Sequence, residues 1–107
     1  MTLSIISAEE NEVLELLKKV VDPELMVNIV DLGLVYGVQK SSKTRAIIIS
    51  VTLTSVGCPM GDVIMQDIEN TLFRYYPDYK ITVQLVWNPK WNPDMATEEG
   101  KLALTEF

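Results

Sequence analysis

The segment from Thr54 to Gly61, TSVGCPMG, contains the single cysteine of the chain, Cys58. Pro59 suits the first position of a helix, so Cys58 is predicted at a helix N-cap. The unpaired amides and positive dipole end of a helix stabilise a thiolate there. Thr54 and Ser55 could donate hydrogen bonds to a bound anion or a sulfur ligand. The alternative is a buried cysteine that fills space beside a helix end.

Two acidic residues, Asp22 and Glu24, flank a proline in the sequence DPEL. They could act as metal ligands or as a proton acceptor near the thiol, or they form a turn that ends a helix. Asp31, in NIVDLG, is interpreted as a turn former. Trp91 lies in an irregular stretch of two WNP triplets and is either a lid over a pocket or a partner surface.

Composition excludes several function classes. The chain has 107 residues, no histidine and one cysteine, which fits a single domain over residues 1–107. A Ser-His-Asp triad, a Cys-His dyad, a histidine metal site and an intrachain disulfide cannot be built from one copy. The net charge of −6 argues against nucleic acid as the main partner. The N-terminal sequence predicts no export signal, and no apolar run could span a membrane, so we expect a cytoplasmic protein.

Hydrophobic periodicity predicts the elements that must position these residues. A helix over residues 8–19 carries an apolar stripe at Val13, Leu16, Leu17 and Val20. A second helix starts after Pro59 and stacks apolar residues at i, i+4 and i+8, with Met65 and Phe73 widening the stripe. Three strands are predicted over residues 34–40, 44–54 and 80–87, with Trp87 in the core. A short last helix begins near Thr97, which could cap it.

This order, α-β-β-α-β-(α), predicts an α+β two-layer sandwich. A small mixed or antiparallel sheet of about three strands would carry the two main helices on one face. The sheet edges stay open in such an arrangement, so a homodimer remains an open alternative.

Four segments in order resemble a known family. They are residues 22–25 (DPEL), 28–36 (NIVDLGLVY), 52–59 (TLTSVGCP) and 86–91 (VWNPKW). Together they resemble the SufT-like iron–sulfur cluster assembly domain, whose relatives include the MIP-type cluster-targeting proteins and PaaD. The resemblance covers about Val13 to Leu104 and implies an FSCA domain-like fold. PaaD proteins carry an extra cysteine-rich portion that this sequence lacks, which favours the SufT branch.

The resemblance implies a cytoplasmic, non-enzymatic factor in iron–sulfur protein maturation. It places the family's cysteine at Cys58, its acidic pair at Asp22 and Glu24, and its hydroxyl pair at Thr54 and Ser55. The implied partners are iron–sulfur scaffold or carrier proteins and client apo-proteins. Clusters are normally held by four thiolate or equivalent ligands. One cysteine therefore predicts transient ligation of a cluster or iron by Cys58, with no cluster held stably by a monomer.

Two other functions compete with this hypothesis. The first is an adaptor with no direct metal or cluster contact, which docks a client or scaffold through the segment around Trp91. The second is a cysteine-dependent enzyme such as a thiol transferase. Without histidine, Asp22 or Glu24 would have to serve as its base.

Overall fold

The computed structural model describes residues 8–54 and 61–105. Its helices are α1 (Ala8–Leu17), α2 (Gly61–Tyr75), the short 3-10 helix η1 (Pro93–Met95) and α3 (Glu98–Thr105). Its strands are β1 (Val21–Asp22), β2 (Val27–Asn28), β3 (Val35–Ser41), β4 (Ala46–Val51) and β5 (Lys80–Leu85). None of the helices in this part of the chain is long and apolar enough to cross a membrane.

The main sheet has three strands in the order β3-β4-β5. β3 and β4 form an antiparallel hairpin, in which Val38 pairs with Ile49. β4 and β5 are parallel, in unbroken register from the Ala46–Lys80 pair to the Val51–Leu85 pair. A parallel pair needs a crossover connection, and α2 lies in that connection. The predicted sheet of about three strands is confirmed, and of the two alternatives, mixed or antiparallel, the structure has the mixed one.

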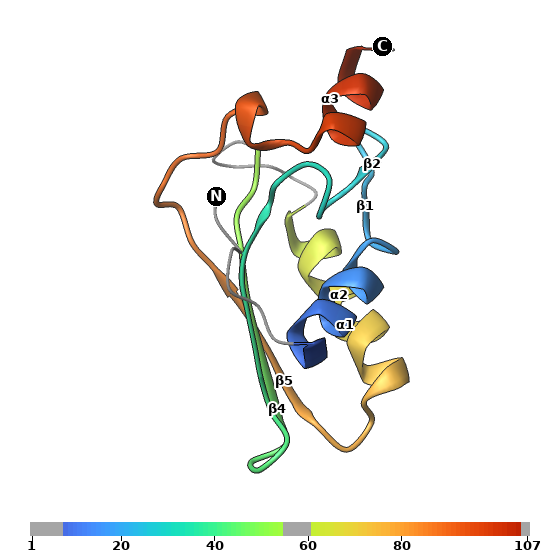
Figure 1. Cartoon of the computed structure of the whole chain (residues 1–107), viewed down its shortest axis with the longest axis vertical. Coiled ribbons are helices and arrows are strands. Elements are labelled where there is room, and N and C mark those ends of the chain that lie inside the picture. Colours follow the sequence, from blue (N-terminus) through green and yellow to red (C-terminus); the bar gives the residue numbers. More distant parts are fainter. Residues whose placement is uncertain (1–7, 55–60, 106–107) are drawn as a thin grey trace.

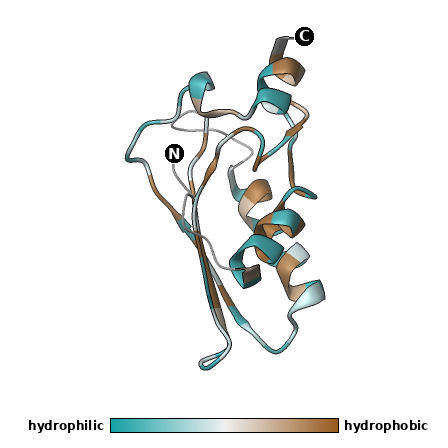
Figure 2. Ribbon diagram, in the orientation of Figure 1, coloured by the Kyte–Doolittle hydropathy of each residue, from teal (hydrophilic) through white to brown (hydrophobic). Residues whose placement is uncertain are grey.

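The core lies between this sheet and the two main helices, which cover one of its faces (Figure 1). Alternation along β4 directs three side chains to the helices, and i, i+4 spacing along α2 directs three side chains back. All six are fully buried: Ile47, Ile49, Val51, Ile64, Ile68 and Leu72. Val13 and Leu17 of α1 are equally buried. Figure 2 shows apolar residues on both the strands and the helices of these two layers.

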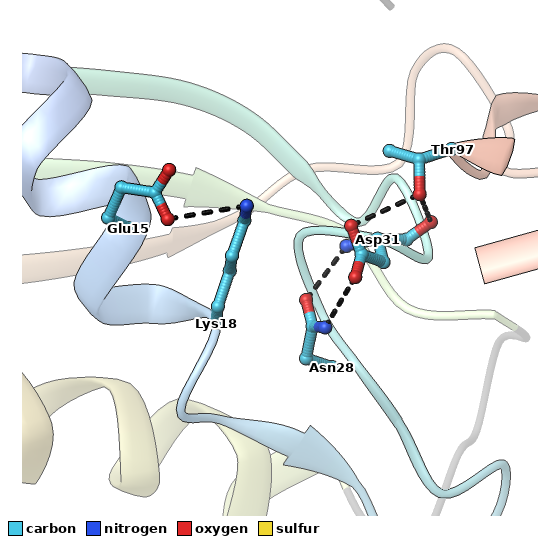
Figure 3. Close-up of polar contacts among 5 residues, drawn as sticks. All are labelled: Glu15, Lys18, Asn28, Asp31 and Thr97. Atoms are coloured by element: carbon cyan, nitrogen blue, oxygen red, sulfur yellow. Dashed lines mark hydrogen bonds and ion pairs between the residues drawn. The ribbon is translucent and has the colours of Figure 1, made fainter. Parts of the chain in front are cut away.

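Helix α1 is shorter than predicted, because it ends at Leu17 and not at Lys19. The next three amides, from Lys18 to Val20, donate to carbonyls three residues back, which is the tighter 3-10 pattern of a helix end. Lys18 Nζ lies 3.3 Å from Glu15 Oε2 (Figure 3). Both side chains are exposed, so this ion pair stabilises the helix by less than about 1 kcal/mol.

Two parts of the fold differ from the sequence prediction. β1 and β2 form a hairpin whose strands have two residues each. The sequence did not predict it, because strands this short show no periodic pattern. The prediction that Trp87 belongs to the core is wrong. β5 ends at Leu85, so Trp87 lies beyond the last paired residue and is 40% exposed.

Candidate functional site

The predicted cysteine segment connects the end of β4 to the start of α2. Cys58 and Ser55 lie outside the described residues, while Thr54 is described and half-buried. The flanks of the segment are in direct contact. A Cβ added at Gly61 would lie 2.7 Å from Leu53 Cδ1, so the Leu53 side chain packs directly on the first residue of the helix. Leu53, at the end of the sheet, and Gly61, at the start of α2, are therefore in contact. In sequence, the cysteine lies between these two residues.

The side chain of Asp22 organises the turn between β1 and β2. Its Oδ1 accepts hydrogen bonds from the amides of Glu24 at 2.8 Å and Leu25 at 3.1 Å. The Met26 amide donates to the Asp22 carbonyl at 2.7 Å, and Met26 itself has a φ of 59°. Asp22 is buried, so these backbone donors replace the water that its carboxylate loses. Oδ2 has no hydrogen-bond donor among the described residues.

The two predicted acidic site residues therefore differ in environment. Glu24 contributes its backbone amide to the Asp22 turn, and its side chain is exposed. Asp22 performs the turn-forming role that the sequence left as an alternative, through hydrogen bonds to Oδ1. Within residues 8–54 and 61–105, no group of three histidine, cysteine, aspartate or glutamate residues is placed to hold a metal ion.

Asp31 joins the turn before β3 to the C-terminal helix. Its Oδ2 accepts from Asn28 Nδ2 at 2.7 Å, and its amide donates to Asn28 Oδ1 at 2.9 Å. Thr97 Oγ1 donates to Asp31 Oδ1 at 3.1 Å (Figure 3). It also accepts from the Gly100 amide at 3.1 Å. The structure confirms the predictions that Asp31 forms a turn and that Thr97 caps the last helix.

Trp91 packs against the same turn. Its indole Nε1 donates to the Leu32 carbonyl at 2.7 Å, and its ring is half-buried against the core. Next to it, Gly33 has a φ of 80°, and a Cβ there would lie 2.3 Å from the Met95 carbonyl oxygen. The chain after β5 therefore lies directly on the residue 31–33 turn, and the polar end of Trp91 is directed inward.

Tyr36 and Thr52 form a polar pair that the sequence did not single out. The Tyr36 hydroxyl donates to the Pro89 carbonyl at 2.7 Å and lies 3.4 Å from Met95 Sδ. Burial raises the pKa of Tyr36 above 10, and the nearby Thr52 hydroxyl offsets part of that rise. Thr52 is fully buried, yet its Oγ1 completes no hydrogen bond in the described part of the chain. No local pattern in the sequence marks the burial of that hydroxyl.

Comparison with known proteins adds to this geometry. Residues 10–83 match the family model described as iron–sulfur cluster assembly protein. The chain is 41% identical to the Fe-S protein maturation auxiliary factor YitW of Bacillus subtilis, over 91% of this chain and 94% of that protein. It is 40% identical to the Fe-S protein maturation auxiliary factor SufT of Staphylococcus aureus, over 79% of this chain and 96% of that one.

Solved structures show the same fold. A domain of unknown function from Bacillus anthracis superposes with a TM-score of 0.86 at 40% identity, over 92% of each chain. A conserved hypothetical protein from Thermotoga maritima gives a TM-score of 0.71 at 30% identity, over 92% of this chain and 93% of the other. Sequence and fold agree, and the chain belongs to the iron–sulfur cluster assembly protein family.

Proposed function

We propose that this chain is a non-enzymatic auxiliary factor in the maturation of iron–sulfur proteins, and that Cys58 ligates a cluster or its iron transiently. The observation that carries the proposal is the position of the cysteine in sequence. It lies between a strand end and a helix start that Leu53 and Gly61 hold in contact, in a chain of this family. Helix N-termini stabilise thiolates, which are the form that binds iron.

The chemistry of the chain limits how a cluster could be held. A cluster normally has four thiolate or equivalent ligands, and this sequence contains one cysteine and no histidine. The missing ligands must come from a scaffold or carrier protein, a client apo-protein or a small thiol. The cluster is therefore cargo that the protein passes on, and we place this step in the cytoplasm, where free thiols stay reduced.

The supporting residues have separate roles in this proposal. Asp22 shapes the β1–β2 turn through Oδ1, and its Oδ2, which has no donor among the described residues, would accept a hydrogen bond from an incoming group. Glu24 offers an exposed carboxylate beside it. Thr54 is the described member of the hydroxyl pair and lies directly after Leu53. Hydroxyl donors beside a metal ligand orient it and tune its affinity.

Anaerobic reconstitution with iron, sulfide and a small thiol tests the ligation step. The wild-type protein is expected to gain visible absorbance and bound iron, and Cys58→Ser is expected to gain neither. Circular dichroism and thermal unfolding must show that the variant keeps its fold. In cells, the same variant should lose maturation of a client iron–sulfur enzyme. A Cys58→Ser protein that matures its client fully would exclude the thiolate role.

That last outcome would favour the adaptor alternative, in which the protein joins a carrier to a client without touching metal. Trp91 then becomes the residue to test, but its indole also holds the Leu32 carbonyl. Trp91→Phe removes this hydrogen bond and keeps an aromatic ring, whereas Trp91→Ala removes both. If Trp91 forms an adaptor surface, Trp91→Ala should weaken client binding. This loss should be larger than the fall in the variant's stability explains.

A further inference from the structure

The outer edge of β5 pairs with no other strand in residues 8–54 and 61–105. The sheet order leaves β3 and β5 as edge strands, and the register of β3 is interrupted between Val35 and Gly37. Bulges of this kind, like prolines and charges, discourage pairing with another chain. β5 has an unbroken register and no proline, and Lys80 is the one charged residue between positions 80 and 87.

Hydrogen bonding shows which backbone groups of β5 face outward. The Lys80 amide donates to the Arg45 carbonyl and the Val86 amide to the Val51 carbonyl, so the even-numbered residues bond to β4. In a parallel ladder the intervening residues direct both their N–H and C=O groups to the other side. Those residues are Ile81, Val83 and Leu85. In the described chain, no hydrogen bond outside the β4 ladder reaches any of them.

The side chains along this edge are apolar and incompletely covered. Ile81 and Val83 are half-buried, Leu85 is 37% exposed, and Trp87 follows them at 40% exposed. Next to Ile81, α2 and β5 border a surface hollow of about 350 Å³, which is also lined by Glu69, Asn70 and Phe73. Phe73 is 60% exposed there. One end of the edge thus presents exposed apolar side chains, and the other end presents a hollow.

We propose that two copies of this chain pair through β5, antiparallel, about a two-fold axis at Val83. This register uses every outward residue: Val83 faces the partner's Val83, and Ile81 faces the partner's Leu85. Each such pair exchanges two backbone hydrogen bonds. Lys80 faces the partner's Val86, so the edge brings no like charges together although each chain has a net charge of −6.

The antiparallel direction also matches the two ends of the edge. It brings the exposed Leu85 and Trp87 of one chain to the end at which the partner's hollow opens beside Ile81. The interface is isologous, with the same surface on both sides, as in most homodimers. A six-residue strand pair with a few apolar contacts is small, so we expect a weak dimer that dissociates at about micromolar concentration.

Thr82 and Gln84 allow a test that leaves the core untouched, because both are exposed and on the sheet face opposite the helices. In the proposed register Thr82 faces the partner's Gln84. The double variant Thr82→Lys/Gln84→Lys therefore sets lysines directly opposite one another, and association should weaken about tenfold. The matched variant Thr82→Lys/Gln84→Glu sets lysine opposite glutamate, and association should be equal to or stronger than that of the wild type.

Sedimentation velocity over a wide concentration range measures these equilibria, with circular dichroism to verify each fold. Mixing Thr82→Lys/Gln84→Lys with Thr82→Glu/Gln84→Glu should give a mixed dimer that associates more tightly than either variant does alone. A wild-type chain that stays monomeric at about 1 mM overturns the proposal, since even small interfaces associate there. If the double-lysine variant dimerises as the wild type does, the dimer uses another surface. If the lysine–lysine and the lysine–glutamate variants weaken the dimer equally, it does not have this register.

Discussion

Asp31 Oδ1 accepts a hydrogen bond of 3.1 Å from the hydroxyl of Thr97, although 66 positions separate the two residues. The same hydroxyl accepts from the Gly100 amide and so caps α3. One side chain therefore starts the last helix and fixes it to the turn that leads into β3. This relationship makes Thr97 a sensitive position for the stability of the C-terminal segment.

Thr97→Val keeps the shape of the side chain and removes its hydroxyl. We expect the free energy of unfolding to fall by about 1–2 kcal/mol, because the helix loses its cap and Asp31 loses a donor. Thr97→Ser keeps both bonds and should remain near the wild type. Urea denaturation of the three proteins measures the difference, and equal midpoints for valine and threonine would contradict the assigned role.

Gly33 is expected to tolerate no side chain. Its φ of 80° disfavours any residue with a Cβ, and that atom would meet the Met95 carbonyl oxygen. Gly33→Ala should destabilise the fold by more than about 2 kcal/mol. Gly37→Ala is the control, because its Cβ would lie 3.5 Å from Ser50 Cβ, an ordinary contact. Thermal unfolding should show a large loss for the first variant and a small change for the second.

Replacing Asp22 separates its structural role from its charge. Asp22→Ala leaves the amides of Glu24 and Leu25 without an acceptor, which should cost about 1–3 kcal/mol of stability. Asp22→Asn keeps an oxygen at that position and should cost less. Glu24→Gln changes an exposed charge and should leave stability within about 0.5 kcal/mol of the wild type. If cluster handling needs the acidic charge, Asp22→Asn and Glu24→Gln will lower iron uptake while remaining folded.

Tyr76 should ionise only well above pH 10. Burial and the hydrogen bond from its hydroxyl to Glu12 Oε1, 2.9 Å long, raise the pKa of Tyr76 to about 12. Lys40 Nζ lies 4.5 Å from the centre of its ring. The pKa of Tyr76 is higher in the folded than in the unfolded state. Its contribution to the stability of the folded state is therefore complete below pH 10 and is lost between pH 10 and 12.

Ultraviolet titration of the phenolate checks this directly. The wild type should show a late ionisation near pH 12 that Tyr76→Phe removes. Glu12→Gln should lower the pKa of Tyr76, because it removes the negative charge beside the phenol. A Tyr76 that ionises near pH 10 would show that the Glu12 contact does not persist in solution.

The sequence predicted the elements whose periodicity is long, and it failed where structure depends on contacts between distant segments. Ile64, Ile68 and Leu72 repeat at helical spacing and are buried as predicted. Trp87 continues the alternation of β5 by residue type, but pairing with β4 stops at Leu85, and no local pattern marks that end. The Asp22 turn follows from the residues themselves, because DPEL favours a turn whether or not a ligand binds.

The site was predictable only in part for the same reason. A cysteine before a proline suggests a helix start, but Cys58 and Pro59 lie outside the described residues, so this stays a prediction; the described part of α2 starts at Gly61. The Tyr36–Thr52 pair depends on residues from β3, from the end of β4 and from the segment near Pro89, which meet only in the folded chain. The burial of the Thr52 hydroxyl results from tertiary packing, and no periodic pattern in the sequence marks it.

The family match ends at residue 83, but the folded unit does not. Three hydrogen bonds, from Tyr36 to Pro89, from Trp91 to Leu32 and from Thr97 to Asp31, tie the following residues to β3 and to the turn before it. A truncation or a fusion junction placed at residue 83 would remove the residues that make these three hydrogen bonds from the C-terminal side. An engineer who transplants this domain into another protein should therefore carry the chain through α3, to residue 105.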